Sequence, residues 1–398
     1  MRTAVVVGAG VGGLATAGAL ARTGWHVTLL ERTDRLRATG VALLIWPNGV
    51  RALHALGLGG GLEAIAFPMG ASGIRRPDGR WLVEADSARD AEAPVVVHAD
   101  DLHDALMAGL GERLDIRTGV DVTTLRAGMA ERPAVGNGKN TWEADLIVAA
   151  DGANSLIRRR LAPEARTIAA GFTAWRAVIP WYRAPVLPDT IPPAGEMLGS
   201  GQRFLHAVLG HRGSAGGSSR GGIYWAATAA GAPRPEGPET QLTLLKRWFS
   251  GWQTPVADLL GATEPDDLVQ RAGEELRPLP RRFGFPVGAG GFALLGDAAH
   301  VATPNLAQGA CLAFEDAATL VALAKDAIPG RTLTAALDAY THARRTRVAR
   351  VARTSRRLGL ILQTQGRMAA RARDAALSAL PPRFLDRASA NSRNWHPQ

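Results

Sequence analysis

The chain has 398 residues, of which 46% are apolar and 21% charged, a composition typical of a globular protein that buries a large core. This length predicts two or three domains. Because Cys311 is the only cysteine, an intramolecular disulfide is excluded, and we expect the protein in the reducing cytoplasm.

The formal net charge is +10, and much of the excess is arginine close to the C-terminus. Steps of three residues would place most of these arginines along one side of a helix, which we interpret as a solvated face. Binding of an anion such as NADPH or an acidic substrate is the alternative, and no nucleic-acid partner is expected. The arginines are Arg344, Arg345, Arg347, Arg350, Arg353, Arg356 and Arg357.

Residues 3–21 carry no charge, as is also true of signal peptides and membrane spans. Five glycines in this run argue against a spanning helix. The run divides into a strand-like part, residues 4–7, and a helix-like part that starts near Gly10. We therefore expect the start of a folded domain, with no targeting segment and no membrane span.

A second short apolar run, residues 27–30, follows the predicted helix. Strand, helix and strand form a βαβ unit, which requires a parallel sheet. Two further apolar runs, residues 146–150 and 292–295, have the same buried-strand character.

The turn after the first strand has the pattern G-x-G-x-x-G, formed by Gly8, Gly10 and Gly13. Gly8 allows a tight turn, Gly10 lets the backbone approach a pyrophosphate, and Gly13 allows the helix to pack on the strand. Glu31, at the end of the second strand, would accept hydrogen bonds from a ribose diol. The unit predicts a dinucleotide-binding site at a helix N-terminus.

Each of the two distant strands ends in a glycine and an aspartate. Asp151 and Gly152 follow one strand, and Gly296 and Asp297 follow the other. Ligands of an open α/β sheet lie at the carboxyl ends of its strands. We therefore expect both pairs to converge on the ligand of the N-terminal glycine turn.

The region from Ile168 to about Gln270 differs in character and contains half of the ten tryptophans. Alternation over residues 171–176 indicates antiparallel strands, and residues 211–222 form a Gly/Ser-rich stretch that predicts a loop. This region predicts a separate sheet inserted into the nucleotide domain. After about Thr332 the chain is rich in Ala, Arg and Leu and is predicted to be helical.

These motifs, in this order and spacing, resemble those of the class A flavin monooxygenases, which have the para-hydroxybenzoate hydroxylase fold. The stretches 151–158 and 296–309 resemble the D-G and G-D motifs of that family. Residues 45–50, 249–256 and 303–305 are similar to the branch that contains urate hydroxylase, salicylate hydroxylase and zeaxanthin epoxidase. The resemblance covers essentially the whole chain and implies FAD as the cofactor.

The resemblance implies an α/β fold with a Rossmann-type FAD-binding domain, an inserted antiparallel β-sheet substrate domain and a C-terminal helical segment. We assign residues 1–70, 95–165 and 280–330 to the FAD-binding domain. Residues 71–94 and 166–279 are assigned to the substrate domain, and residues 331–398 to the helical segment.

The resemblance also assigns cofactor-binding roles along the chain. Asp297 would bond the ribityl and pyrophosphate region, Asp151 would orient FAD and the nicotinamide cofactor, and the Pro304 segment would lie over the flavin. The helix that starts at Gly309 and Ala310 would point its N–H groups at the flavin edge that becomes negative on reduction. The expected cofactor-binding set is Gly8, Gly10, Gly13, Glu31, Arg37, Asp151, Gly152, Gly296, Asp297, Pro304, Gln308, Gly309 and Ala310.

Two positions depart from the family pattern. Ala307 replaces a glycine, which is harmless unless that position needs a positive φ. Ala99 replaces an arginine that usually contacts FAD, so its absence would either weaken cofactor binding or leave that role to another cation such as Arg37. Residues 175–180 come close to a halogenase signature, but Ala177 replaces its second tryptophan, so halogenation is not expected.

The reaction implied by the resemblance uses NAD(P)H and dioxygen. Reduced flavin would form a C4a-hydroperoxide that hydroxylates or epoxidises an electron-rich aromatic or polyketide-like small molecule, with no metal. Arg203 matches a substrate-binding arginine of the urate hydroxylase branch, and Tyr224 is a candidate phenol partner. A flavin oxidoreductase without oxygen transfer and a flavin-free binding protein are the alternatives. A monomer or a homodimer is expected.

Four other residues invite a functional role but are interpreted as structural. Trp175 and Trp225 are assigned to a hydrophobic core rather than to a pocket. Cys311 is interpreted as a small buried residue. His300 is interpreted as a packing group behind Asp297 rather than a catalytic base.

Overall fold

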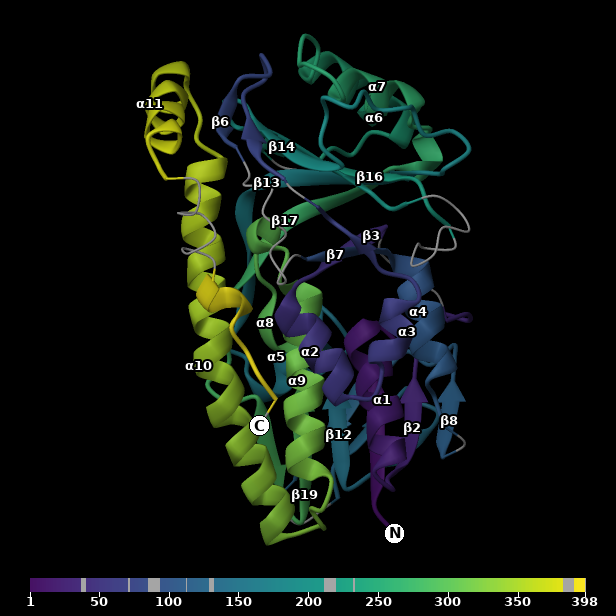
Figure 1. Ribbon diagram of the computed structural model, residues 1–398. Coiled ribbons are helices and arrows are strands. Elements are labelled where there is room, and N and C mark those ends of the chain that lie inside the picture. The colour runs from purple at the N-terminus through teal and green to yellow at the C-terminus, as the bar shows by residue number, and fades with distance from the viewer. Residues whose placement is uncertain are drawn as a thin grey trace.

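The computed structural model describes residues 1–36, 41–70, 72–84, 94–111, 113–128, 132–210, 220–231, 233–381 and 390–397. Two sheets lie one above the other, and one long helix runs beside both (Figure 1). The six-stranded sheet of the lower half is parallel apart from one edge strand. In spatial order its strands are β18 (Gly284–Val287), β19 (Gly290–Leu294), β12 (Leu146–Ala149), β1 (Thr3–Val7), β2 (His26–Leu30) and β8 (Leu114–Arg117).

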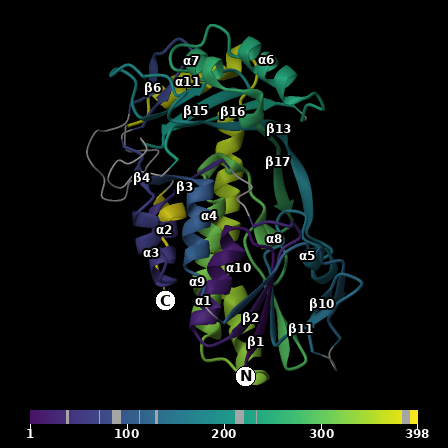
Figure 2. The same cartoon turned by 90° about the vertical axis from the view of Figure 1, so that its right-hand side faces the viewer.

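The four apolar runs predicted as strands are therefore neighbours in one sheet, and β12, β1 and β19 are almost entirely buried. Helices α1 (Val11–Arg22) and α9 (Gly309–Ala324) contact each other, as Figure 2 shows from the side. Helix α9 also contacts α2 (Pro47–Ala55) and α10 (Arg331–Leu362). Further short helices are α3 (Gly59–Glu63), α4 (Ala99–Ala108), α5 (Leu156–Leu161) and α8 (Asp297–His300).

The upper sheet has seven strands, and all its neighbouring pairs except β14–β5 are antiparallel. In spatial order they are β17 (Val269–Arg277), β13 (Arg166–Ile179), β16 (Ile223–Ala230), β15 (Gln202–Val208), β14 (Ala194–Leu198), β5 (Ile74–Arg75) and β6 (Trp81–Val83). The predicted inserted antiparallel sheet is thus present. Its outer face is covered by α6 (Pro238–Trp248) and α7 (Val256–Ala262).

Because side chains alternate along a strand, each residue of this sheet faces either the outer helices or the lower half of the molecule. Trp175, Phe204 and Trp225 face outward and form one buried cluster with residues of α6 and α7. The interpretation of Trp175 and Trp225 as core residues is confirmed. Their neighbours in sequence, among them Arg176 and Tyr224, lie on the opposite face, called the inner face below.

Two small sheets complete the strands. In the first, β3 (Ala42–Ile45) and β4 (Phe67–Pro68) pair with β7 (Val95–His98), and its apolar side chains pack against the inner face of the upper sheet. The second consists of β9 (Thr124–Arg126), β10 (Ala134–Gly136) and β11 (Thr141–Glu143). The first sheet therefore lies between the two halves.

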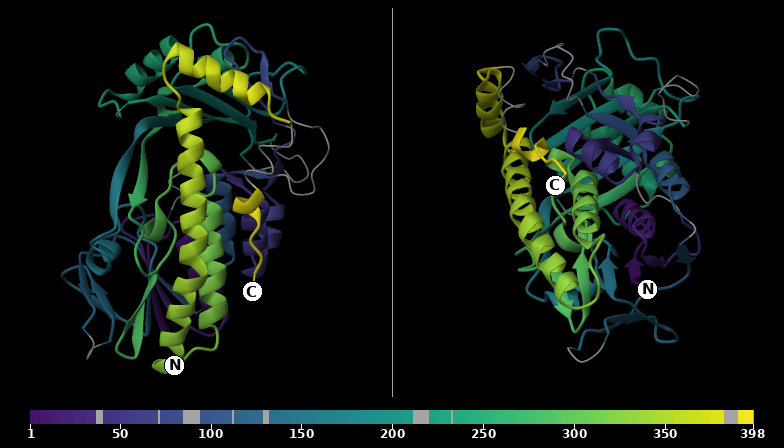
Figure 3. Two further views of the ribbon diagram at one scale, coloured as in Figure 1. Left: turned by 90° about the vertical axis from the view of Figure 1, so that its left-hand side faces the viewer. Right: turned by 60° about the horizontal axis from the view of Figure 1, so that its bottom comes forward.

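Helix α10 runs the height of the molecule and is followed by α11 (Arg367–Ser378), which lies against the upper sheet (Figure 3). Residues 390–397 return to α2, where Arg51 donates hydrogen bonds to the carbonyls of Arg393 and Trp395. The helical C-terminal region was predicted. No helix among the described ranges is long and apolar enough to cross a membrane.

The interpretation of the α10 arginines as a solvated face is wrong for Arg344 and Arg347, whose side chains are only 1% and 10% exposed. Both meet carboxylates of α9. It holds for four others, which are exposed: Arg345, Arg350, Arg353 and Arg357. The fold class is as predicted, and the exact domain boundaries stay a prediction.

Candidate functional site

Three turns meet at the carboxyl edge of the parallel sheet, as predicted. Strands β12 and β19 pair in register with one another, and β1 pairs with β12 on its other side. Gly8, Asp151 and Gly296 each follow the end of one of these strands closely. The three turns therefore lie side by side.

Two glycines of the first turn are required by close packing. A Cβ at Gly8 would lie 2.3 Å from the carbonyl oxygen of Ala150, and a Cβ at Gly13 would lie 2.0 Å from that of Gly8. Gly8 also has a φ of +103°, which disfavours any other residue. These contacts match the turn and packing roles that the sequence predicted.

Three other glycines line open space. A Cβ built at Gly10, Gly152 or Gly309 would meet no atom within 4 Å. Gly10 has an ordinary extended backbone, with φ −68° and ψ 173°, so neither backbone strain nor packing requires a glycine there. The space beside it, at the N-terminus of α1, fits a pyrophosphate that approaches the backbone closely.

Glu31 follows β2 and reaches back to the glycine turn. Its carboxylate accepts a 2.8 Å hydrogen bond from the backbone N–H of Ala9 and 3.0 Å bonds from the backbone N–H and hydroxyl of Thr33. The acid is thus at the position predicted for ribose recognition, and that role stays a prediction.

Asp151 is only half satisfied. One carboxylate oxygen accepts a 2.9 Å hydrogen bond from the N–H of Leu156, but the other is buried and has no partner among the described residues. Burial raises the pKa of Asp151. An unpaired buried acceptor is costly, so this oxygen is suited to a ligand that donates a hydrogen bond.

Asp297 combines two properties that rarely occur together. Its side chain is exposed to solvent, yet desolvation by the surrounding protein raises its pKa. No donor of the described residues is within hydrogen-bond distance of this carboxylate, and positive charges at His300 and Arg176 act on it from a greater distance.

The turn that carries Asp297 is held from behind by a buried ion cluster. Asp316 on α9 accepts hydrogen bonds from the N–H of Gly296 (3.0 Å) and from Arg344 (2.7 Å), and pairs with His300 (2.5 Å). Burial alone would lower the pKa of His300, but Asp316 reverses this and raises it. His300 is therefore a positioning group, as interpreted from the sequence.

Glu315, the neighbour of Asp316, extends this cluster to the loop that precedes α9. Glu315 pairs with Arg344 (2.7 Å) and Arg347 (2.8 Å), and also accepts a 2.7 Å hydrogen bond from Asn48. Asn48 in turn donates a 2.8 Å bond to the side chain of Gln308. The side chain of Gln308 is thus turned inward, which leaves its backbone as the part that can contact a cofactor.

The inner face of the upper sheet holds the two predicted substrate residues. Arg203 on β15 is clamped by both carboxylate oxygens of Glu196 on β14, at 2.5 and 2.9 Å. Tyr224 on β16 lies on the same face, and burial raises its pKa. Arg176 on β13 shares the face as well and was not among the predicted site residues.

The remaining predicted residues have mixed outcomes. Pro304 opens the short 3₁₀ helix 304–306 and is half-buried, and Gly309 and Ala310 begin α9 as predicted. Ala99 begins α4. Arg37 and residues 211–219 lie outside the described residues. Within the described ranges no three His, Cys, Asp or Glu side chains are grouped to hold a metal.

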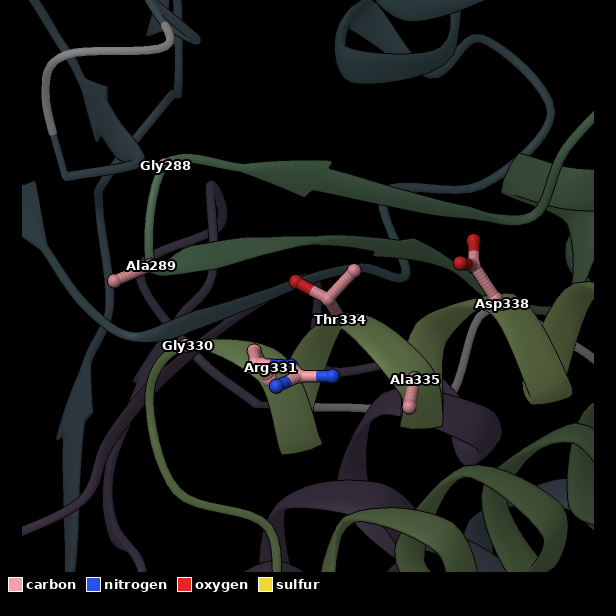
Figure 4. A pocket seen from close by; sticks show the side chains of 7 residues that line it. All are labelled: Gly288, Ala289, Gly330, Arg331, Thr334, Ala335 and Asp338. Carbon is pink, nitrogen blue, oxygen red and sulfur yellow. The ribbon is translucent and has the colours of Figure 1, made fainter.

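Two cavities lie apart from the three turns. One of about 580 Å³ is bounded by the turn at Gly288–Ala289 and by Arg331 and Asp338 at the start of α10 (Figure 4). This is at the amino end of β19, opposite the edge that carries Asp297. The other, of about 540 Å³, is lined by Trp175 and Trp248, on the outer side of the upper sheet.

The departure at Ala307 has a structural cost, because this residue has a φ of +50° in the left-handed region. A non-glycine residue there costs about 1–2 kcal/mol. We expect Ala307→Gly to stabilise the protein by about 0.5–1 kcal/mol in urea denaturation. The gain is smaller than the strain because glycine loses more conformational entropy on folding than alanine does. Ala352→Gly within α10 is the control and should destabilise by about 1 kcal/mol. Equal effects of the two changes would refute the strain.

The cluster behind the turn predicts a large effect at Arg344. Arg344→Met leaves two buried carboxylates without their shared partner, and we expect a loss of about 3–5 kcal/mol in the free energy of unfolding. Arg350→Met, an exposed change on the same helix, should stay within about 0.5 kcal/mol. A loss at Arg344 no larger than at Arg350 would contradict the role of the cluster.

Comparison with known proteins agrees with this geometry. A family model described as an FAD binding domain matches residues 1–228 and 282–355. The aurachin C monooxygenase/isomerase of Stigmatella aurantiaca is 30% identical over 395 residues, which cover 96% of each chain. The 3-amino-4-hydroxybenzoate 2-monooxygenase of Streptomyces cremeus is 32% identical and covers 89% of this chain and 86% of its own.

Among solved structures, Klebsiella pneumoniae HpxO complexed with FAD and uric acid superposes with a TM-score of 0.83 at 26% identity. The match covers 98% of this chain and 96% of that chain. The chain therefore belongs to the FAD binding domain family and is an FAD-dependent monooxygenase of class A, as its motifs predicted.

Proposed function

We propose that this enzyme uses NAD(P)H and dioxygen to hydroxylate or epoxidise an electron-rich aromatic or polyketide-like small molecule. The observation that carries the proposal is the open space beside Gly10, Gly152 and Gly309, at the edge that also presents Asp297. Substrate, O2, NAD(P)H and a proton would give oxygenated substrate, NAD(P)+ and water.

The residues of the three turns have the chemistry to hold FAD. Glu31 would accept from the ribose, the N-terminus of α1 at Gly10 would bind the pyrophosphate, and the unpaired oxygen of Asp151 would accept a cofactor hydroxyl. The N–H groups at the start of α9 would stabilise negative charge on the flavin ring. When bound, FAD supplies the two-electron and oxygen-activating chemistry, which side chains cannot.

The protein's own contribution is to orient the substrate and keep water away. The β3–β4–β7 sheet packs against part of the inner face, which would exclude water from that side. Tyr224, on that face, would direct a hydroxyl or carbonyl of the substrate. Arg203 is held by Glu196, so it would bind substrate only as part of that pair.

The relatives suggest the class of ring. Their names specify 3-amino-4-hydroxybenzoate, urate and a 2-heptyl-3-hydroxy-4-quinolone, each a ring compound with nitrogen or oxygen donors. Such donors raise the electron density of the carbon that receives oxygen. We infer a substrate of this kind, a cytoplasmic location, and a monomer or homodimer as the active form.

Consumption of NADPH tests the proposal. Purified protein with FAD is assayed against phenols, quinolones, purines and indoles, and products are weighed by mass spectrometry. Faster NADPH oxidation coupled to a product heavier by one oxygen atom supports it. Ligand-stimulated NADPH oxidation that yields only hydrogen peroxide, with every compound unchanged, would instead indicate an oxidoreductase without oxygen transfer.

Gly10 separates cofactor binding from folding. A methyl group at this position would contact no protein atom, and the backbone conformation of Gly10 is open to any residue. The methyl group would, however, occupy the space proposed for the pyrophosphate. We expect Gly10→Ala to unfold like the wild type without FAD and to bind FAD at least about tenfold more weakly. Gly13→Ala, whose Cβ would clash with Gly8, should unfold more easily. Wild-type FAD affinity in Gly10→Ala would disprove the assignment.

A further inference from the structure

One row of side chains on the inner face carries charge only at its two ends. Cross-strand pairing aligns Arg176, Ala226, Leu205 and Glu196 in one row across four strands. The middle of the row, formed by Ala226 and Leu205, is therefore apolar. Arg203 belongs to the next row, beside Thr228.

Arg203 is already neutralised. Both oxygens of Glu196 receive its N–H groups, and the two side chains are 10% and 19% exposed. A two-point pair of this kind is strong, and separating it would leave a poorly solvated carboxylate. Arg203 and Glu196 together thus present no net charge to a ligand.

Arg176 is different. It is half-buried, and none of the described residues forms a hydrogen bond or an ion pair with its guanidinium. Asp297 forms no ion pair with Arg176, although the two charges interact. A partly desolvated cation without a partner costs free energy, unlike the satisfied Arg203.

We propose that Arg176 is the specificity-determining residue of this site and receives a single anionic oxygen of the substrate, a carboxylate or an ionised ring hydroxyl. The inference rests on the proposed function in one respect, that the inner face is where the substrate binds. One unpaired cation selects a ring compound with a single negative charge, and the Arg203–Glu196 pair, which has no net charge, does not attract a second one.

The test compares salicylate with salicylamide, which have nearly the same shape but differ in charge at neutral pH. Binding to the FAD-loaded protein is measured by calorimetry, which requires no turnover. We expect salicylate to bind more tightly than salicylamide, and Arg176→Gln to weaken salicylate by about 10–100-fold while salicylamide changes by less than about twofold. Arg176→Lys should restore part of the affinity, since lysine keeps the positive charge but lacks the planar set of N–H donors of the guanidinium.

Arg166→Gln, which removes an exposed arginine from the same strand, is the control and should leave both affinities unchanged. Unaltered salicylate binding in Arg176→Gln, equal weakening of both ligands, or no saturable salicylate binding to the wild type would each overturn the assignment. Failure of the proposed function is seen separately, as absence of an oxygenated product in the NADPH assay.

Discussion

Parallel pairing of β1, β12 and β19 in one register is the constraint on which the site depends. It brings the ends of three strands from distant parts of the chain to one edge of a sheet. Gly8, Asp151 and Gly296 lie together only because each follows its own strand so closely. The close approach of Gly8 to Ala150 shows how little tolerance this arrangement has, since even a methyl group would force two of the turns apart.

The edge is held by charge as well as by strand pairing. Two adjacent acids on α9 bind different parts of this edge. Asp316 accepts a hydrogen bond from the turn at Gly296, and Glu315 accepts one from Asn48, which in turn bonds to Gln308. Arg344 joins both acids and ties them to α10. Because α10 also runs beside the upper sheet, the same helix contacts both halves between which substrate would bind. The ion cluster is therefore a structural support whose loss would disturb cofactor and substrate positions together.

The sequence predicted the parts of the site that follow from local pattern. A glycine turn between a strand and a helix has few possible structures, and Asp151 and Asp297 were found because each ends a buried apolar run. Arg344 was misjudged because a three-residue step was read as a polar face. It lies in the apolar stripe of α10 with Tyr340 and Val348, and two acids within the otherwise apolar α9 were the available sign of its partner. The clamp on Arg203 was not predictable, since it depends on the pairing register of strands joined by a turn.

Four unsatisfied or strained features belong to the candidate site, although other buried polar atoms without a partner among the described residues, such as those of His103 and Arg183, lie elsewhere. Within the described ranges, Asp151 has a buried oxygen without a partner and Arg176 an unpaired guanidinium, while Asp297 has a desolvated carboxylate and Ala307 a strained backbone. Behind them, Asp316 and Arg344 are buried and pair with each other. Burial of a charge costs free energy whether the charge is paired or not, but only a paired charge offsets this cost within the folded protein itself. The groups without a partner would be satisfied by the cofactor and substrate that we propose for this site, whereas the paired acids of α9 are satisfied within the protein.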